Sequence, residues 1–261
     1  MQALSYRNVL NKKEVYKLDL DIEIENVSKN FGEVNAVKNL NLQVRRGEVF
    51  CLVGPNAAGK TTTIRLLLGI LEMDSGKIKV KNLDIPSEKK KLRVFAGYLP
   101  QHRALYNLLT CRENIEFFAK ARNMPKRDLK ERVDFMIDKL SLNEHQDKLA
   151  INLSGGTQQR TALAIAMVNN PEIAFLDEPT AGLDPVIRRE FWEYFAEIAH
   201  QQRTTILVTT HYLNEAAWAD RVGVMRDGDI IAIDTPGNLL AHTKQQNMED
   251  MFFALVKEDS A

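Results

Sequence analysis

Short apolar runs and helical spacings of apolar residues alternate along this chain. Runs of about four to eight apolar residues, and alternation of apolar with polar positions, predict strands. In chain order the predicted strands are 22–32, 39–45, 49–53, 77–81, 95–99, 173–176, 205–209, 222–225 and 229–233. The strands 49–53 and 173–176 are continuously apolar, as expected for strands in a buried sheet.

Apolar residues that recur every three or four positions predict the helices. These are a helix from Thr62 onward, an almost wholly helical region from about 105 to 150, and helices at 155–168, 186–201 and 248–256. Helix and strand alternate from residue 155, so the predicted fold class is α/β, with a mostly parallel core sheet and helices on its faces. The region 105–150 is then a helical insert.

Composition narrows the functional classes. Of 261 residues, 44% are hydrophobic and 27% are charged, which is typical of a globular protein. Lys plus Arg and Asp plus Glu each total 35, so no net field favours nucleic acid, and no nucleic acid is expected as a partner. Apolar runs fall short of the ~20 residues that cross a bilayer, and residues 1–21 lack a secretory signal. With only Cys51 and Cys111, we expect a reduced, cytoplasmic protein.

The strand 49–53 leads into a loop with the spacing of a phosphate-binding site. Gly54, Gly59, Lys60 and Thr61 fill every fixed position of the pattern G-x-x-x-x-G-K-[ST]. Small residues let N–H groups point inward, and the following helix adds the positive end of its dipole. We expect Lys60 to reach the β- and γ-phosphates and Thr61 to bind Mg²⁺. A tight turn without a ligand is the alternative for any Gly-rich loop.

The whole loop is expected to surround the nucleotide. Its residues are Gly54, Pro55, Asn56, Ala57, Ala58, Gly59, Lys60, Thr61 and Thr62.

Two acids follow the strand 173–176, at the edge of an α/β sheet where ligands bind. Adjacent strand residues point to opposite sides, so the two can have separate roles. We expect Asp177 to hold Mg²⁺, and Glu178 to orient or deprotonate the attacking water. Without the phosphate loop, a solvated strand end would be the better interpretation.

The segment LSGGTQQR lies shortly before these acids. Ser154 can cap a helix that begins at Gly155, and Gly155 and Gly156 allow phosphate to approach the helix N-terminus. A capped helix without a ligand is the alternative. At this spacing the sequence resembles the ATP-binding subunit of ABC transporters, and the resemblance covers about residues 22–233, with the motifs in the family's order.

The resemblance implies a P-loop cassette with an N-terminal antiparallel β subdomain and a helical subdomain at about 105–165. It also implies ATP and Mg²⁺ as ligands. By position the motifs correspond to the Walker A loop 54–62, the Q-loop glutamine Gln101, the signature 153–158, the Walker B aspartate Asp177, the catalytic glutamate Glu178, the D-loop Asp184 and the switch histidine His211.

The family also implies individual roles for these residues. Gln101 is expected to touch Mg²⁺ and sense a transmembrane partner, and His211 to contact the γ-phosphate beside Lys60 and Glu178. Alone, Gln101 would be an ordinary loop amide and His211 a structural histidine. In this family the two phosphate-facing motifs of one chain face different nucleotides, so a head-to-tail dimer with a second ATP-binding subunit, identical or related, is expected.

Three positions depart from the family pattern. Ala57 stands where the loop usually has glycine, and nucleotide binding is expected to survive with altered geometry. Phe31 stands where a tyrosine usually stacks on adenine; phenylalanine keeps the π-face. A buried aromatic at a strand end is the alternative for Phe31. Thr157 replaces a longer signature residue.

The expected membrane partner is a separate permease. Leu105, Tyr106, Leu108 and Leu109 begin the helical insert, where the family has its groove for a transmembrane segment. The phrase LYNLLTCREN and the closing MEDMFFALVKE resemble ABC-2-type exporter subunits, which move drugs, lipids or polysaccharides. The expected function is therefore an ATPase at the cytoplasmic face of the membrane that powers export.

Two other functions stay open. One is a soluble ABC-type ATPase that acts on DNA or ribosomes, and the other is a nucleotide-gated scaffold without turnover. Glu178 and His211 favour turnover. The predicted organisation is an N-terminal extension at 1–20, the ATP-binding domain at 21–245 and a C-terminal helix at 246–261.

Overall fold

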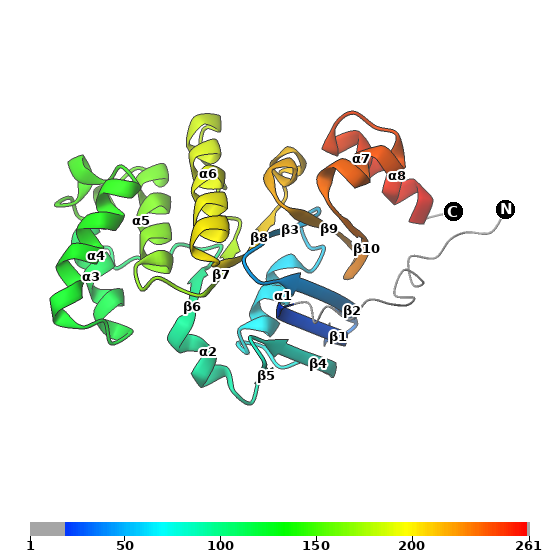
Figure 1. Ribbon diagram of the computed structural model, residues 1–261, viewed down its shortest axis with the longest axis horizontal. Coiled ribbons are helices and arrows are strands. Elements are labelled where there is room, and N and C mark those ends of the chain that lie inside the picture. Colours follow the sequence, from blue (N-terminus) through cyan, green and yellow to red (C-terminus); the bar gives the residue numbers. More distant parts are fainter. Residues whose placement is uncertain (1–18, 260–261) are drawn as a thin grey trace.

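The computed structural model describes residues 19–259, so residues 1–18 of the predicted extension lie outside the described part. Two sheets and a helical lobe make up the fold (Figure 1). The strands are β1 Leu20–Phe31, β2 Val34–Arg45, β3 Val49–Val53, β4 Ser75–Val80, β5 Leu83–Ile85, β6 Ala96–Leu99, β7 Ile173–Asp177, β8 Thr205–Thr210, β9 Arg221–Arg226 and β10 Asp229–Asp234. The helices are α1 Lys60–Leu67, α2 Lys89–Phe95, α3 Cys111–Ala121, α4 Lys126–Lys139, α5 Gly155–Met167, α6 Pro185–Gln202, α7 Pro236–Thr243 and α8 Met248–Asp259.

The core is a six-stranded sheet in the order β10-β9-β3-β8-β7-β6. Strands β9, β3, β8, β7 and β6 pair in parallel, and only the edge strand β10 is antiparallel to its neighbour within this sheet. The predicted mostly parallel core sheet is confirmed. The carboxyl ends of its central strands therefore meet at one edge, where ligands bind in α/β folds.

Both faces of the core sheet are covered, which explains why β3 and β7 are continuously apolar. In β3, Phe50 and Leu52 face α1 and the N-terminal strands. Cys51 and Val53 point the opposite way and join the cluster that contains α5 and α6. Two separate hydrophobic cores thus share one sheet.

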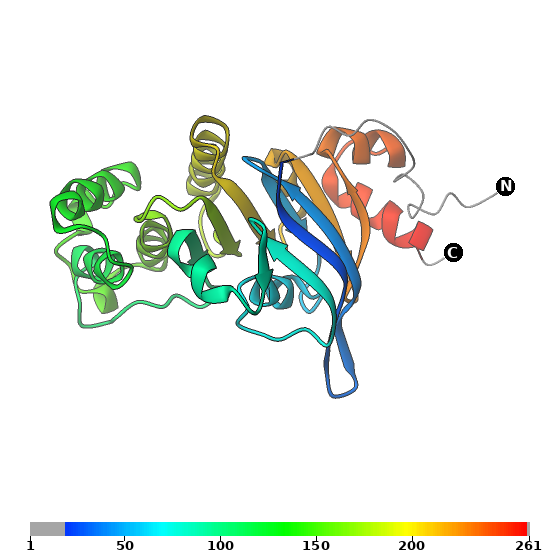
Figure 2. The same ribbon diagram turned by 60° about the horizontal axis from the view of Figure 1, so that its bottom comes forward.

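The N-terminal strands form a second sheet in the order β2-β1-β4-β5, and every pairing in it is antiparallel. The predicted antiparallel β subdomain is confirmed. Strands β1 and β2 form a long hairpin whose last pair is Phe31 with Val34. Figure 2 shows this hairpin extending beyond the rest of its sheet. Phe31 therefore lies at the end of this hairpin.

Helices α3, α4 and α5 form a lobe between β6 and β7, at the opposite end of the molecule from α7 and α8 (Figure 1). The expectation of an almost wholly helical 105–150 is wrong at its start, because residues 102–110 form a loop. The buried side chain of Asn114 donates hydrogen bonds to the carbonyls of Tyr106, Leu109 and Thr110, at 3.1, 3.2 and 2.9 Å. The carbonyls of Tyr106 and Leu109 are thus satisfied outside a helix, whereas that of Thr110 also accepts from the backbone N–H of Asn114 at the start of α3.

Three short elements were not predicted: β5, α2 and α7. In α2, Leu92 is the one buried residue, so the helix has no apolar stripe to reveal it. Helix α7 did carry a signal, because Thr235 caps it and proline follows at the first helical position. Helix α8 occupies the predicted C-terminal region and buries Met248, Met251 and Leu255.

Candidate nucleotide-binding site

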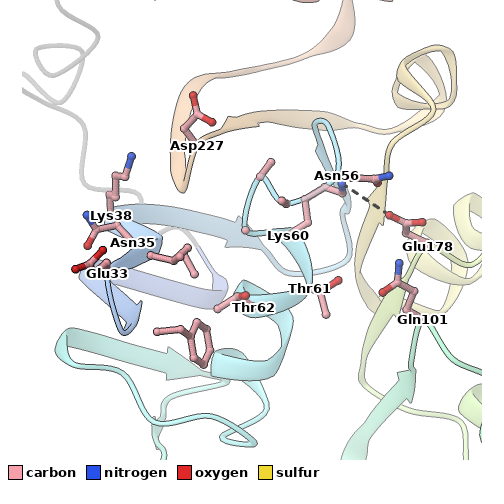
Figure 3. A pocket seen from close by; sticks show the side chains of 16 residues that line it. Glu33, Asn35, Lys38, Asn56, Lys60, Thr61, Thr62, Gln101, Glu178 and Asp227 are labelled. Atoms are coloured by element: carbon pink, nitrogen blue, oxygen red, sulfur yellow. Dashed lines mark ion pairs between the residues drawn. The ribbon is translucent and has the colours of Figure 1, made fainter.

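A cavity of about 720 Å³ opens between the phosphate loop, the end of the β1–β2 hairpin and the carboxyl edge of the core sheet (Figure 3). Many of the residues predicted to bind nucleotide line it. These are Phe31, Asn56, Ala57, Ala58, Gly59, Lys60, Thr61, Thr62, Gln101 and Glu178.

The phosphate loop approaches α1 through Gly59, which has a φ of +108°. A Cβ at this position would lie 2.4 Å from the carbonyl oxygen of Ala36, so only glycine fits. No side chain caps the first turn of α1 within the described residues. The N–H groups of this turn are therefore left to a ligand, at the positive end of the helix dipole.

Lys60 is buried at the floor of the cavity, with 4% of its surface exposed. Its Nζ donates to the carbonyls of Gly54 and Pro55, at 2.8 and 2.9 Å, and lies 3.8 Å from Oε1 of Glu178 (Figure 3). Burial lowers the pKa of Lys60, and the carboxylates of Glu178 and Asp177 oppose that shift. The backbone of the phosphate loop thus surrounds the ammonium group of Lys60.

Asp177 lies under the start of α1 and is fully buried. Its Oδ1 accepts hydrogen bonds from Thr61 Oγ1 at 3.0 Å and from Thr209 Oγ1 at 2.6 Å. Burial raises the pKa of Asp177, and these two hydrogen bonds oppose the shift. The other oxygen, Oδ2, is buried without a hydrogen-bond partner in the described part of the chain. A buried carboxylate oxygen beside a hydroxyl is a donor set that fits a hard divalent cation.

Glu178 turns away from Asp177 and faces His211. The distance from His211 Nδ1 to Glu178 Oε2 is 3.0 Å. The backbone of Glu178 has a φ of +52°, uncommon for a residue other than glycine. Its N–H holds this conformation by donating to Thr209, both to the carbonyl and to Oγ1, at 3.1 Å each. The structure therefore brings together all three residues that the sequence predicts to be catalytic, Lys60, Glu178 and His211.

The predicted signature residues and Asp184 do not line this cavity. Ser154 caps α5 by accepting from Thr157 N at 3.2 Å, ahead of Gly155 and Gly156. Asp184 caps α6. Within one chain Ser154 and Asp184 cap the N-termini of helices, and they do not line the nucleotide cavity.

The prediction from sequence missed the residues that two hairpins add to the cavity wall. These are Glu33, Val34, Asn35, Ala36 and Lys38 from the β1–β2 hairpin, and Asp227 from the β9–β10 turn. Ordinary turn residues of this kind carry no signal, because only the folded hairpins place them beside the phosphate loop.

A buried cation in a glycine-rich loop, an acid pair and the carboxyl edge of a parallel sheet define a P-loop nucleotide-binding protein. The pattern of the ABC transporter family matches residues 37–181, more than half of the chain. The chain belongs to this family, and the resemblance predicted from the sequence is confirmed.

Curated relatives support the same assignment. The probable multidrug ABC transporter ATP-binding protein YbhF of Escherichia coli is 36% identical over 242 residues, which are 91% of this chain and 42% of that protein. This chain thus spans less than half of that relative. The daunorubicin resistance ATP-binding protein DrrA3 of Streptomyces coeruleorubidus is 38% identical over 226 residues, 86% of this chain and 71% of that protein.

Among solved structures, the dimeric ATP-binding cassette MJ0796 in a post-hydrolysis state, bound to ADP and Pi, superposes with a TM-score of 0.76. It is 27% identical, and the match covers 82% of this chain and 98% of that one. The predicted ABC-type cassette fold is confirmed.

The backbone at Ala57 generates the first prediction. Its φ of +66° is left-handed, which explains why related loops use glycine there. An L-residue pays about 1–2 kcal/mol in this conformation, and glycine loses about 0.4–1 kcal/mol through its freer unfolded chain. Ala57→Gly should therefore raise the free energy of unfolding by about 0.5–1 kcal/mol, measured by urea titration.

Ala58→Gly is the matched control. Ala58 is buried and does not have a positive φ, so glycine there removes a buried methyl and should destabilise the protein. If Ala57→Gly destabilised the protein as much as Ala58→Gly does, the conformation at Ala57 would carry no strain.

Proposed function

We propose that this chain hydrolyses ATP and powers a separate transmembrane permease that exports its substrate. The observation that carries the proposal is the cluster in which Glu178 contacts His211 at 3.0 Å and lies 3.8 Å from Lys60, at the wall of a cavity of nucleotide size. A scaffold without turnover would have no need to hold a carboxylate in a strained backbone between an imidazole and a cation.

ATP would lie with its phosphates over the first turn of α1. Lys60 would exchange the carbonyls of Gly54 and Pro55 for phosphate oxygens, which are stronger partners because they are charged. Adenine would stack on Phe31, whose side chain is 49% exposed on the cavity wall with Lys29 Nζ 5.6 Å from the ring centre. This exposure argues against the alternative in which Phe31 is a core residue.

Mg²⁺ would be held by Thr61, Asp177 and Gln101. Thr61 and Gln101 line the nucleotide cavity. Asp177 lies behind Thr61, whose hydroxyl donates to its Oδ1, and its unpartnered Oδ2 supports this assignment. When bound, the ion neutralises charge on the β- and γ-phosphates.

In hydrolysis, Glu178 would accept a proton from the attacking water, and His211 would orient the carboxylate and contact the γ-phosphate. The contact between His211 Nδ1 and Glu178 Oε2 at 3.0 Å supports this orienting role.

A second ATP-binding subunit, identical or related, would complete the site. The N-terminus of α5, with Ser154, Gly155 and Gly156, does not line the nucleotide cavity of its own chain. It would bind the γ-phosphate of the partner's ATP, with Asp184 nearby. The dimeric assembly of the MJ0796 cassette supports this arrangement. ATP would then bridge the subunits, and hydrolysis would release them.

The permease would dock on the loop that precedes α3. Tyr106 and Leu108 are 50% and 80% exposed, and Phe117 beside them is 43% exposed. The ring centres of Tyr106 and Phe117 lie 4.7 Å apart. Asn114 and a capping box between Thr110 and Glu113 hold the loop rigidly, so its apolar side chains are presented to a partner. The segment LYNLLTCREN comprises the end of this loop and the first turn of α3.

Two observations bear on the cellular role. Within residues 19–259, no helix combines the length and the apolar character that a membrane crossing requires. One relative is described as a probable multidrug ABC transporter ATP-binding protein, and another as a daunorubicin resistance ATP-binding protein. These descriptions of the relatives support our proposal that the chain is attached, through its permease, to the cytoplasmic face of the membrane. A soluble ABC-type ATPase is the second candidate, and co-purification with a membrane protein in detergent separates the two.

Phe31 provides a test of the nucleotide orientation. Phe31→Ala should weaken ATP binding by about 1–3 kcal/mol, because stacking on adenine is lost, and Phe31→Tyr should be nearly neutral. Calorimetry with ATP measures both. Equal affinities for all three proteins would show that adenine binds elsewhere.

Glu178 provides the test of hydrolysis. Glu178→Gln keeps the size of the side chain but cannot accept a proton, so ATP should still bind while turnover falls by about 10² or more. The variant should also sediment as a dimer in Mg-ATP and as a monomer without it. Glu193→Gln, on an exposed face of α6, is the control. Normal turnover by Glu178→Gln would remove Glu178 from the mechanism.

Leu108 tests the docking surface. Leu108→Asp should leave folding and basal ATP hydrolysis unchanged, since the side chain is 80% exposed, but it should abolish co-purification with the permease. Phe253→Asp on α8, which alters a side chain that is 60% exposed elsewhere, is the control. Retention of the permease by Leu108→Asp would place the docking surface elsewhere.

A further inference from the structure

Glu215 is a buried acid that the proposed chemistry does not use. It lies in the 3₁₀ turn Leu213–Trp218, directly after His211, and is 3% exposed. Its backbone N–H donates to Tyr212 O at 3.1 Å. A carboxylate so deeply buried must be satisfied by specific partners.

Its partners come from the two segments that carry the reactive pair. Oε2 of Glu215 accepts from Thr180 Oγ1 at 2.7 Å and from Thr210 Oγ1 at 3.1 Å. Thr180 follows Glu178 by two residues, and Thr210 immediately precedes His211. One oxygen atom therefore joins the turn after Glu178 to the strand end before His211.

Further contacts fix the carboxylate itself. Trp192 Nε1 lies 3.4 Å from the same oxygen, and Arg188 Nη1 is 3.9 Å from Oε1. Within the described residues, Oε1 has no hydrogen-bond partner. Arg188 also donates from Nε to Leu183 O at 2.8 Å, beside the D-loop Asp184. The acid thus sits where the Walker B strand, the D-loop and the switch strand converge.

Stability alone is a poor reason for this arrangement. A buried ion pair is often replaceable by apolar side chains at little cost, and here the charges are 3.9 Å apart. What its hydrogen bonds do is join Thr180, two residues after Glu178, to Thr210, one residue before His211. A catalytic group displaced by about 1 Å can lose about 10²-fold in rate.

We propose that Glu215 is a positioning residue for ATP hydrolysis, which holds Glu178 against His211 through the hydroxyls of Thr180 and Thr210. The proposal rests on the proposed function, in which Glu178 and His211 carry the reaction. None of Glu215, Thr180 and Thr210 lines the nucleotide cavity. Their loss should therefore change turnover and leave ATP binding unchanged.

The test uses the full chain and compares kcat with KM for ATP. Thr180→Val removes the hydroxyl at constant volume and carries no charge, so it should fold. We expect its kcat to fall about tenfold or more, with KM for ATP within about twofold. Thr180→Ser keeps the hydroxyl and should restore kcat. Glu215→Gln, whose neutral oxygen is a weaker acceptor, should show the same split.

Asp21→Asn is the matched control. Asp21 is another buried acid, 4% exposed, and it accepts a hydrogen bond from the hydroxyl of Thr205. Thr205 begins β8, at the end of the strand opposite to Thr210 and the switch. We expect this variant to have a lower melting temperature and an unchanged kcat. If Thr180→Val behaved in the same way, or if Thr180→Ser were as slow as Thr180→Val, the positioning role of Glu215 would be overturned.

Different results would overturn the proposed hydrolysis of ATP itself. A wild-type chain without ATPase activity, or a Glu178→Gln variant with normal activity, would overturn the proposed function. A wild-type chain whose activity depends on Glu178 but not on the Thr180 hydroxyl would overturn only the role of Glu215.

Discussion

The register of three adjacent parallel strands is the constraint on which the site depends. In β3, Val53 pairs with Thr210 of β8, and in β8, Thr209 pairs with Asp177 of β7. This pairing places the ends of the three strands side by side, so the phosphate loop, the acid pair and His211 emerge at one edge. A shift of one residue in any strand would send the reactive side chains to the opposite face.

Burial gives this edge its chemistry. Lys60, Asp177 and Glu178 lie together with at most 8% of each exposed, and no apolar sequence could substitute for their charges. Desolvation raises the pKa of Asp177 and lowers that of Lys60, because burial disfavours the charged form of each side chain. A bound cation at Asp177 and a bound anion at Lys60 would each favour the charged form again. Asp177 Oδ2 accepts no hydrogen bond within the described residues, and Lys60 Nζ donates to the carbonyls of Gly54 and Pro55.

Buried polar residues outside the cavity fix the backbone of two loops. Asn114 bonds to carbonyls of the loop before α3, in which Tyr106 and Leu108 are exposed. Glu215 accepts hydrogen bonds from the hydroxyls of Thr180, in the turn after Glu178, and Thr210, at the strand end before His211.

The sequence by itself determined the family, the strands of the core sheet and the residues of the phosphate loop. It could do so because G-x-x-x-x-G-K-[ST] and the acid pair are local patterns, and buried parallel strands are continuously apolar. The tertiary structure decided what depends on contacts between distant segments. It placed Asp227 and Asn35 in the cavity wall, and it gathered the hydroxyls of Thr180 and Thr210 around one oxygen atom of Glu215. No local pattern marks such residues, because their partners lie up to 35 positions away and only folding brings them within hydrogen-bond distance.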